Sequence, residues 1–216
     1  MALDVEGYTK MNIGLDIDGC LTDIENFHLK YGVPFFEKKF NKHVVNEYGK
    51  SIRQLFDCTS AEEARFWLKH MIKYTIKDPV REGAADFTNW AYENGHKVYI
   101  ITSRAFSTKE NIIGKLARWA VRRWLKKSGI QYEEITFCDE DKLPALKKYN
   151  VSYMVEDDPD NIVAMQDITK VICMNAKCNQ HLTRECACKC DSFEDVLDYI
   201  KCECEKFFKV PTYIVS

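Results

Sequence analysis

Short apolar runs rich in β-branched residues alternate with helical stretches along most of this chain, and this alternation constrains the fold most strongly. Five runs indicate strands that are buried on both faces, as in parallel sheets. They are residues 11–16 (MNIGLD), 97–103 (KVYIITS), 134–139 (EITFCD), 151–157 (VSYMVED) and 170–175 (KVICMN). Strands that alternate with helices form a parallel sheet covered on both faces. The sequence therefore predicts a doubly wound α/β fold.

Start and stop signals predict the helices between these strands. Asp78-Pro79 has the residue types of an N-cap and a first helical position, and Gly95 is typical of a helix end. The apolar residues of that segment that share one helical face are Ala84, Phe87, Trp90 and Ala91. Similar signals predict helices over residues 108–128, 142–149, 159–167 and 191–206.

Residues 25–77 interrupt the alternation, because they contain amphipathic stretches and no convincing strand. In SAEEARFWLKHMIKY, the apolar residues at helical spacing are Ala64, Trp67, Leu68 and Met71. We predict a small helical domain inserted after the first strand. Residues 1–24 and 78–216 would then form the α/β core.

Polar and acidic side chains directly follow three of the predicted strands. Ligands of open α/β sheets bind beyond the carboxyl ends of the strands. The residues at these ends are Asp16, Asp18, Thr102, Ser103, Glu156, Asp157 and Asp158. Carboxylates in one crevice raise one another's pKa unless a cation neutralises them. Because carboxylates and water are the ligands of Mg²⁺, which leaves positions for phosphate oxygens, we predict a Mg²⁺ site here, with Thr102 and Lys142 holding a phosphate.

The pair Asp16 and Asp18 has two simpler interpretations. A DxDG string also begins calcium loops, but those loops need glycine at the sixth position, whereas Gly19 is fourth. An acidic pair can equally cap a helix that begins near Thr22 or Asp23. Taken alone, the pair does not decide between a cap and a catalytic site, and its co-occurrence with the other strand ends favours the catalytic site.

Four motifs in this order resemble those of the haloacid dehalogenase superfamily of aspartate-nucleophile phosphatases. DIDGCLTD resembles its first motif, and VYIITSR resembles its second, an apolar strand ending in Thr or Ser. Lys142 matches the lysine of the third motif, and YMVEDDPDN resembles the acidic fourth. REGAADFTNWAYENGHKVYIITSR and DKLPALKKYNVSYMVEDDPDNI are most similar to the 5'(3')-deoxyribonucleotidases and their bacterial relatives. The resemblance covers residues 11–175 apart from the insertion, and it implies a Rossmann-like core with a helical C1-type cap.

The resemblance also implies the catalytic and metal-binding residues. Asp16 would be the nucleophile, and Asp18 would protonate the leaving alcohol and then deprotonate the attacking water. Mg²⁺ would be bound by Asp16, by the backbone carbonyl of Asp18 and by Asp157. Asp158 remains an alternative to Asp157 if the acidic pair is placed one residue later.

The phosphate would be bound by Thr102, Ser103 and Lys142. Lys147 and Lys148 are alternatives to Lys142, which the spacing to Asp157 favours. Glu156 would orient metal-bound water, and Gly19 would let the backbone turn tightly beside the phosphate. The superfamily carries its cap where this chain has its insertion, and such a cap excludes water from the site.

Aromatic side chains of the cap are candidates for substrate specificity. Phe35, Phe36 and Trp67 could stack on a nucleobase, which would suit a nucleotidase. Aromatic residues at helical spacing more often form the core of their own domain. A phosphatase for another small phosphate, such as a sugar phosphate, therefore remains an alternative.

Composition bears on the partners. Lys plus Arg (31) nearly balances Asp plus Glu (33), and the net charge of −2 favours neither a nucleic acid polymer nor a membrane as partner. We expect a small phosphorylated substrate, and the sequence leaves open whether the chain forms a homodimer. MALDVEGYTK lacks the features of a signal peptide, and no window approaches the roughly 18 apolar residues of a membrane span. We therefore expect a cytoplasmic protein.

Cysteine is frequent near the end of the sequence. The cysteines from residue 178 onward are Cys178, Cys186, Cys188, Cys190, Cys202 and Cys204. CNQHLTRECACKC could bind zinc, but its CxC spacing suits a strand better than a zinc knuckle, and free thiols are the simpler interpretation. A cysteine-rich metal-binding or regulatory protein with a vestigial core is thus a third functional class.

Overall fold

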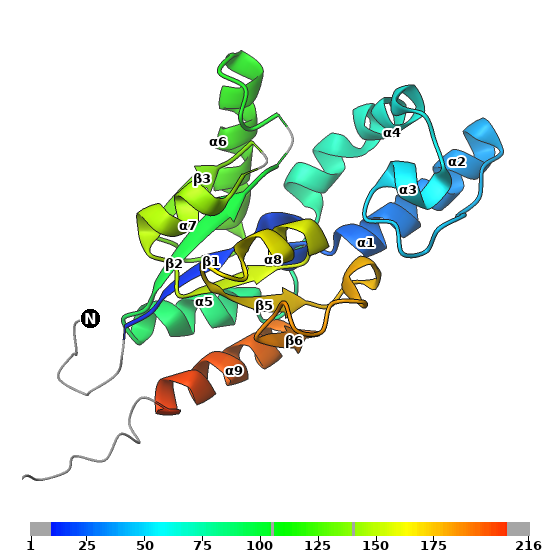
Figure 1. Cartoon of the computed structure of the whole chain (residues 1–216). Helices are drawn as coiled ribbons and strands as arrows, with labels where there is room; N and C mark the ends of the chain where they lie inside the picture. The colour runs from blue at the N-terminus through cyan, green and yellow to red at the C-terminus, as the bar shows by residue number, and fades with distance from the viewer. Residues whose placement is uncertain (1–9, 105, 140, 207–216) are drawn as a thin grey trace, which may run out of the picture.

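The core is a single parallel sheet in the computed structural model, which describes residues 10–104, 106–139 and 141–206 (Figure 1). Its six strands lie in the order β3-β2-β1-β4-β5-β6. They are β1 (Asn12–Leu15), β2 (Lys97–Thr102), β3 (Glu134–Phe137), β4 (Tyr153–Glu156), β5 (Lys170–Met174) and β6 (Cys188–Cys190). The chain builds the sheet outward from β1 in two directions, with β2 and β3 on one side and β4, β5 and β6 on the other. Ligands of such sheets bind beyond the strand ends at the point where the direction changes. The predicted α/β fold and all five predicted strands are confirmed.

Strand β6 extends the sheet beyond the five predicted strands. Ile172 pairs with Cys188 and Met174 pairs with Cys190, in parallel register with β5. The CxC pair thus occupies alternate positions of a strand, as its spacing favoured.

Helices cover both faces of the sheet. They are α5 (Ala84–Glu93), α6 (Ile112–Lys127) and α9 (Phe193–Lys206) on one face, and α7 (Leu143–Tyr149) and α8 (Pro159–Met165) on the other. Ile13 and Leu15 pack against the first group, and Met154 packs against the second. Strands β2, β4 and β5 are therefore apolar on both sides, which explains their continuous apolar sequences. Among the described residues, no helix is both long and apolar enough to cross a membrane.

Helix α5 begins later than Asp78-Pro79, so the predicted start was wrong. Asp78 instead closes the short helix η3 (Lys73–Lys77), since its N–H donates to the Lys73 carbonyl (3.0 Å). Gly83, with φ of 77°, precedes the first residue of α5. Helix α6 also starts later than predicted, because Asn111 caps it by accepting a hydrogen bond from the Gly114 N–H (3.1 Å).

The insertion after β1 is helical, as predicted. It contains α1 (Ile24–Phe27), the short helix η2 (His28–Gly32), α2 (Val33–Phe40), α3 (Ile52–Phe56), α4 (Ser60–Ile72) and η3. Its own core is aromatic, with Phe36 stacked on Phe56 (4.5 Å between centroids) and Phe66 fully buried. This separate core supports our proposal that residues 25–77 form a cap on a core made of residues 1–24 and 78–216.

His28 lies inside the cap core without charge compensation. It is 3% exposed, its ring meets Trp67 edge to face (5.6 Å), and its Nε2 has no hydrogen-bond partner. Burial lowers the pKa of His28 from about 6.5 to about 4. His28 is therefore neutral in the folded protein at pH values at which the unfolded chain is protonated.

Replacing His28 by leucine is expected to flatten the acid dependence of stability. As the pH falls, the unfolded chain binds this proton first, so the wild type loses about 3 kcal/mol of unfolding free energy between about pH 6.5 and about pH 4. Above about pH 6.5 the wild type keeps this part of its unfolding free energy in full. Urea denaturation of both proteins over this range measures the difference. His43→Gln, at an exposed histidine, should keep the wild-type slope, and a wild-type slope in His28→Leu would contradict a buried neutral imidazole.

Candidate active site

Asp16 is fixed at the carboxyl end of β1 by the neighbouring strand. Its N–H donates to the Val155 carbonyl (3.1 Å), which extends the pairing of β1 and β4 by one residue. The chain then turns sharply over Ile17–Leu21, where Gly19 has φ of 91°. The sheet therefore ends with the Asp16 carboxylate at the crevice beside β4.

Three buried carboxylates meet at this crevice. Ligand oxygens of Asp16, Glu156 and Asp157 lie within 4.8 Å of one another. In the part of the chain that the structure describes, this is the only group of three or more such metal-ligating side chains.

On β6, the Sγ atoms of Cys188 and Cys190 lie 3.7 Å from each other, and all ten cysteines are free thiols. The described thiols thus lack the geometry of a zinc site.

Lys142 joins two of the carboxylates. Its Nζ lies 2.9 Å from Asp16 Oδ1 and 2.7 Å from Glu156 Oε2. Burial lowers the pKa of Lys142, but the carboxylates of Asp16 and Glu156 outweigh burial and raise the pKa above its ordinary value. Lys142 is therefore charged. The alternative lysines are remote from this ion pair: Lys148 pairs with Glu134 at the surface (3.0 Å), and Lys147 is exposed.

Glu156 positions Lys142 and the following loop. Its Oε1 accepts hydrogen bonds from the N–H groups of Asp157 and Asp158 (3.2 Å each), while its Oε2 accepts from Lys142. Both oxygens are thus occupied by protein donors. This arrangement differs from the water-orienting role that the sequence motif implied.

The acidic cluster suits a divalent cation. Burial, together with the carboxylates of Glu156 and Asp18, raises the pKa of Asp16 to about 7, although Lys142 opposes the shift. Burial and the carboxylates of Glu156 and Asp16 likewise raise the pKa of Asp157. A cation bound between these groups would remove the repulsion. Gly19 leaves the room for this cluster, because a Cβ there would overlap the Asp157 carboxylate.

The predicted phosphate-binding residues line the same cavity. A cavity of about 160 Å³ is bordered by Asp16, Asp18, Lys50, Thr102, Ser103, Lys142, Asp157, Asp158, Asn161 and Cys178. The Thr102 hydroxyl is fully buried and has no hydrogen-bond partner among the described residues. A buried hydroxyl without a hydrogen-bond partner costs free energy, unless a ligand supplies that partner. Thr102 is therefore free to bind a phosphoryl oxygen.

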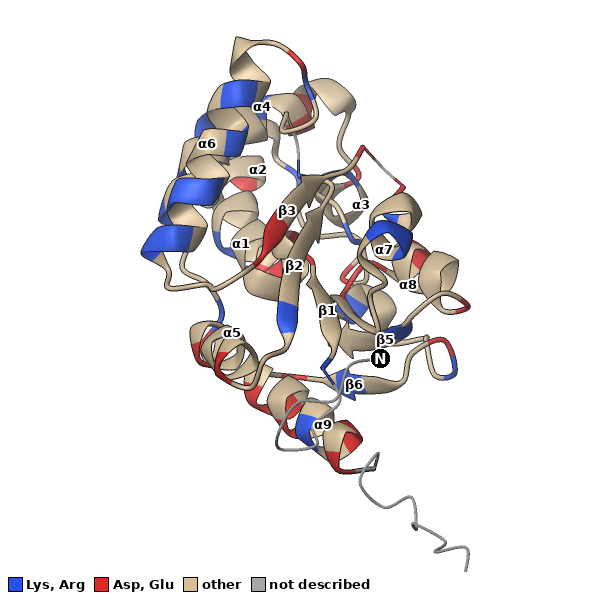
Figure 2. Cartoon of the chain, turned by 90° about the vertical axis from the view of Figure 1, so that its left-hand side faces the viewer, with Lys and Arg blue, Asp and Glu red and all other residues tan. Residues whose placement is uncertain are grey.

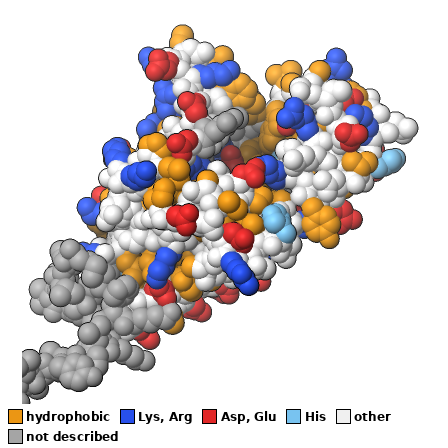
Figure 3. Space-filling model, in the orientation of Figure 1, with side chains coloured by type: hydrophobic (Ala, Val, Ile, Leu, Met, Phe, Trp, Pro, Cys, Tyr) orange, Lys and Arg blue, Asp and Glu red, His pale blue; other side chains and the backbone are white. Residues whose placement is uncertain are grey.

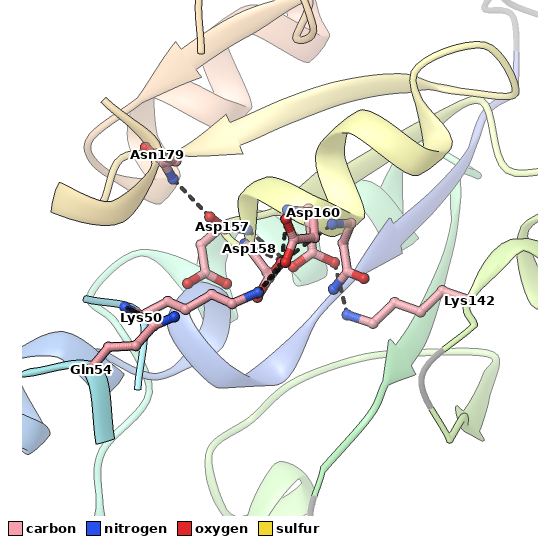
Figure 4. Close-up of polar contacts among 9 residues, drawn as sticks. Lys50, Gln54, Lys142, Asp157, Asp158, Asp160 and Asn179 are labelled. Atoms are coloured by element: carbon pink, nitrogen blue, oxygen red, sulfur yellow. Dashed lines mark hydrogen bonds and ion pairs between the residues drawn. The ribbon is translucent and has the colours of Figure 1, made fainter. Parts of the chain in front are cut away.

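Asp158 has a different environment from Asp157. Its side chain caps α8 by accepting hydrogen bonds from the N–H groups of Asp160 and Asn161 (2.9 and 3.2 Å). Lys50, from the cap, pairs with Asp158 (3.0 Å) and with Asp160 (Figure 4). The carbonyl of Asp157 accepts a hydrogen bond from Asn179 (2.8 Å). Asp157, rather than Asp158, belongs to the acidic cluster.

Asp18 contacts two residues that the sequence did not identify as its partners. The Tyr74 hydroxyl donates to Asp18 Oδ1 (2.7 Å), and Arg104 Nε lies 3.4 Å from the same oxygen. Tyr74 belongs to η3 and was not among the predicted site residues. Arg104 directly follows the strand-end pair Thr102 and Ser103, and this position is the one sequence signal that could have found it.

A second cavity, of about 420 Å³, lies on the cap side of Asp18, and Figure 3 shows a hollow between the cap and the rest of the molecule. From α4 it is lined by Ala64, Trp67, Leu68 and Met71, and from the core by Arg104 and Phe106. The helical face predicted from the sequence therefore lines this cavity, while Phe66 packs into the cap. Trp67 borders the cavity as the specificity prediction requires. Phe35 and Phe36 do not, because both are buried in the cap core.

No family model matches the sequence, and no curated protein matches it. Solved structures share its architecture at low identity. CbbY from Rhodobacter sphaeroides, in complex with xylulose-(1,5)-bisphosphate, matches with a TM-score of 0.56 and 16% identity over 86% of this chain and 95% of that one. β-Phosphoglucomutase from Clostridium difficile matches with a TM-score of 0.59 and 14% identity over 93% of this chain and 99% of that one. A HAD-superfamily hydrolase, subfamily IA, from Geobacter sulfurreducens matches with a TM-score of 0.56 and 12% identity over 90% of this chain and 98% of that one. The chain has the haloacid dehalogenase fold, with a helical cap inserted after the first strand.

The substitution Gly19→Ala is expected to weaken divalent-cation binding by about 10–100-fold, because the added methyl group displaces the Asp157 carboxylate. Titration calorimetry with Mg²⁺ and Mn²⁺ measures the loss. Gly129→Ala is the matched control, since Gly129 has a similar φ of +74° but its Cβ would meet no atom nearer than 3.7 Å. Both variants strain the backbone by about 1 kcal/mol or more, so equal cation affinities in the two would contradict a cation site at Asp157.

Proposed function

We propose that this chain hydrolyses phosphomonoesters through an aspartyl-phosphate intermediate and uses Mg²⁺. The observation that carries this proposal is the position of Asp16, which pairs with Lys142 and lines one cavity with the unpartnered hydroxyl of Thr102. A carboxylate nucleophile, a fixed cation and a free donor are what phosphoryl transfer to a side chain requires. The fold supports the proposal, since hydrolases are among the similar structures.

The cation would be held by the carboxylates of Asp16 and Asp157 and by the backbone carbonyl of Asp18. When bound, it supplies positive charge that offsets the negative charge of the carboxylates and of the phosphoryl oxygens. Lys142 and Thr102 would hold the remaining phosphoryl oxygens, with Ser103 at the edge of the cavity. Glu156 would keep Lys142 in place.

In the first step, Asp16 attacks phosphorus, its oxygen forms the new bond, and the bond to the leaving oxygen breaks. Asp18 gives its proton to that leaving oxygen, so an alcohol departs. In the second step, Asp18 takes a proton from a water molecule, which attacks the aspartyl-phosphate. Inorganic phosphate is released and the Asp16 carboxylate is restored.

A chain of hydroxyl groups suits Asp18 to both steps. Tyr74 Oη lies 2.7 Å from Asp18 and 2.8 Å from Thr22 Oγ1, which lies 3.1 Å from the Ile17 carbonyl. With Asp18 ionised, Tyr74 donates to it. With Asp18 protonated, Asp18 donates to Tyr74, Tyr74 to Thr22, and Thr22 to Ile17. No hydroxyl proton lacks an acceptor in either state, so the cap residue Tyr74 stabilises Asp18 throughout the cycle.

Nucleoside monophosphates are the proposed substrates. The cavity beside Asp18 is of the size of small-molecule sites, which span roughly 300–1,000 Å³, and it is lined by Trp67, Leu68 and Met71. An apolar wall with an indole suits a planar nucleobase better than a sugar rich in hydroxyl groups. Sugar phosphates are the second candidate, because one similar structure holds xylulose-(1,5)-bisphosphate.

Asp16→Asn is expected to lower phosphate release by at least about a thousandfold, because the amide is a poor nucleophile. The assay measures phosphate released from nucleoside monophosphates and sugar phosphates with Mg²⁺ present, and Asp167→Asn, at an exposed position, is the control. Release that survives Asp16→Asn would overturn the aspartyl-phosphate mechanism. No release from any ester would overturn the hydrolase proposal and favour a cysteine-rich regulatory protein. Faster release from sugar phosphates would overturn the nucleotide proposal alone.

Trp67→Ala is expected to raise KM for nucleoside monophosphates by about 5–100-fold, since loss of a stacking ring costs about 1–3 kcal/mol per base. The value of kcat should change less than KM, because Trp67 would contact the base and is linked to Asp18 through Tyr74, whose ring centroid lies 5.6 Å from that of Trp67. Trp119→Ala is the control, as Trp119 is exposed on α6. Because Trp67 also stacks near Phe27 in the cap, Trp67→Phe tests folding, and it should recover most of the affinity. An unchanged KM in Trp67→Ala would contradict binding of the base in this cavity.

A further inference from the structure

Helix α6 has a strongly basic outer face. Its sequence IIGKLARWAVRRWLKK contains no acidic residue. Its basic residues are Lys115, Arg118, Arg122, Arg123, Lys126 and Lys127. Figure 2 shows them as bands along the outer edge of the molecule, while acidic residues gather on α5 and α9. None of the six forms an ion pair within the described residues: Arg118 donates to backbone carbonyls, and Arg123 lies over the Trp119 ring.

The first turns of the same helix expose large apolar side chains. Ile112 is 75% exposed, Ile113 56%, Leu116 60% and Trp119 59%. The inward face of α6 is occupied by other residues, among them Val121, Trp124 and Leu125, which pack against the sheet. The exposed group is therefore not part of the core, and grouped exposed apolar residues mark contact sites.

Apolar and basic residues form one continuous stripe. Positions at heptad-like spacing along the outer face are Ile112, Leu116, Trp119, Arg123 and Lys126. The stripe is apolar in its first half and basic in its second. Figure 1 shows that the apolar end of α6 projects beyond the sheet, so it can reach a flat surface.

We propose that this face of α6 docks on an anionic phospholipid surface. Lys and Arg would contact the lipid phosphates, while Ile, Leu and Trp side chains would enter the interfacial region, as in helices that lie on membranes. The basic charge of α6 selects an anionic partner, and the protruding aliphatic and indole groups select a partner with an apolar interior. The balanced total charge, from which we expected no membrane partner, conceals this separation of charge.

Docking through α6 leaves the catalytic cavity unobstructed. None of the exposed α6 residues borders the cavity at Asp16 or the cavity beside Asp18. Variants of this face therefore test docking without altering the proposed hydrolysis.

Co-sedimentation of the full chain with vesicles tests the proposal. We expect binding to vesicles of phosphatidylcholine mixed with phosphatidylserine, weak binding to phosphatidylcholine alone, and loss of binding as salt is raised. The double variant Arg123→Glu/Lys126→Glu should weaken binding at least about 25-fold, since each basic residue near such a surface contributes about a fivefold factor. Trp119→Ala should weaken it as well, by removing an interfacial anchor.

A control with the same change in total charge is Lys38→Glu/Lys147→Glu, at exposed positions outside α6. It should bind vesicles as the wild type does. Equal binding to neutral vesicles, or equal loss in the control, would overturn the proposal. Binding to a soluble acidic polypeptide without binding to vesicles would assign the face to an acidic protein. Self-association in sedimentation velocity that Arg123→Glu/Lys126→Glu abolishes would assign it to a second copy of the chain; either result would also overturn the proposal.

Discussion

The buried ion pair of Lys142 with Asp16 and Glu156 is the interaction on which the rest of the site depends. It connects the ends of β1 and β4 with the start of α7, and all three groups are shielded from water. Removing one partner of such a group leaves an uncompensated buried charge, which costs about 3–5 kcal/mol. The pair therefore holds the Asp16 carboxylate at the crevice through its Oδ1 atom, which lies 2.9 Å from Lys142 Nζ.

Sheet topology brings the remaining core residues to this ion pair. Strand β1 lies between β2 and β4, so the ends of three neighbouring strands carry Thr102, Asp16 and Asp157 side by side. The one-residue extension of the ladder at Asp16 and the glycine at position 19 then set the spacing between the carboxylates of Asp16 and Asp157. The proposed chemistry is thus a consequence of strand order, which brings these side chains to one edge of the sheet.

This dependence explains what the sequence could predict. The strand ends Asp16, Thr102 and Asp157 were found because each follows a continuous apolar run, and parallel strands end at one edge of the sheet. The start of α5 was misplaced, because Asp78-Pro79 has the local chemistry of a helix start while its backbone serves to close η3.

Lys50, Tyr74 and the Glu156–Lys142 contact were not found, since each depends on packing between segments far apart in the sequence. Arg104 lay beside a motif, but only the fold directs it to Asp18. The apolar face of α4 was predicted correctly as a pattern. Its residues line a cavity, and Trp67 also packs against the cap core.

The contacts also divide the proposed reaction between two parts of the chain. Lys142, Glu156 and Thr102 all belong to the core, so the groups that would hold the phosphoryl oxygens do not depend on the cap. Tyr74 and Lys50 belong to the cap, and they contact Asp18 and Asp158, each close in sequence to a core carboxylate of the site. A movement of the cap would therefore alter the proton donor and the cavity for the leaving group, while the nucleophile would keep its ion pair with Lys142. Under the proposed mechanism, the core determines that a phosphoryl group is transferred, and the cap determines which alcohol leaves and when it receives its proton.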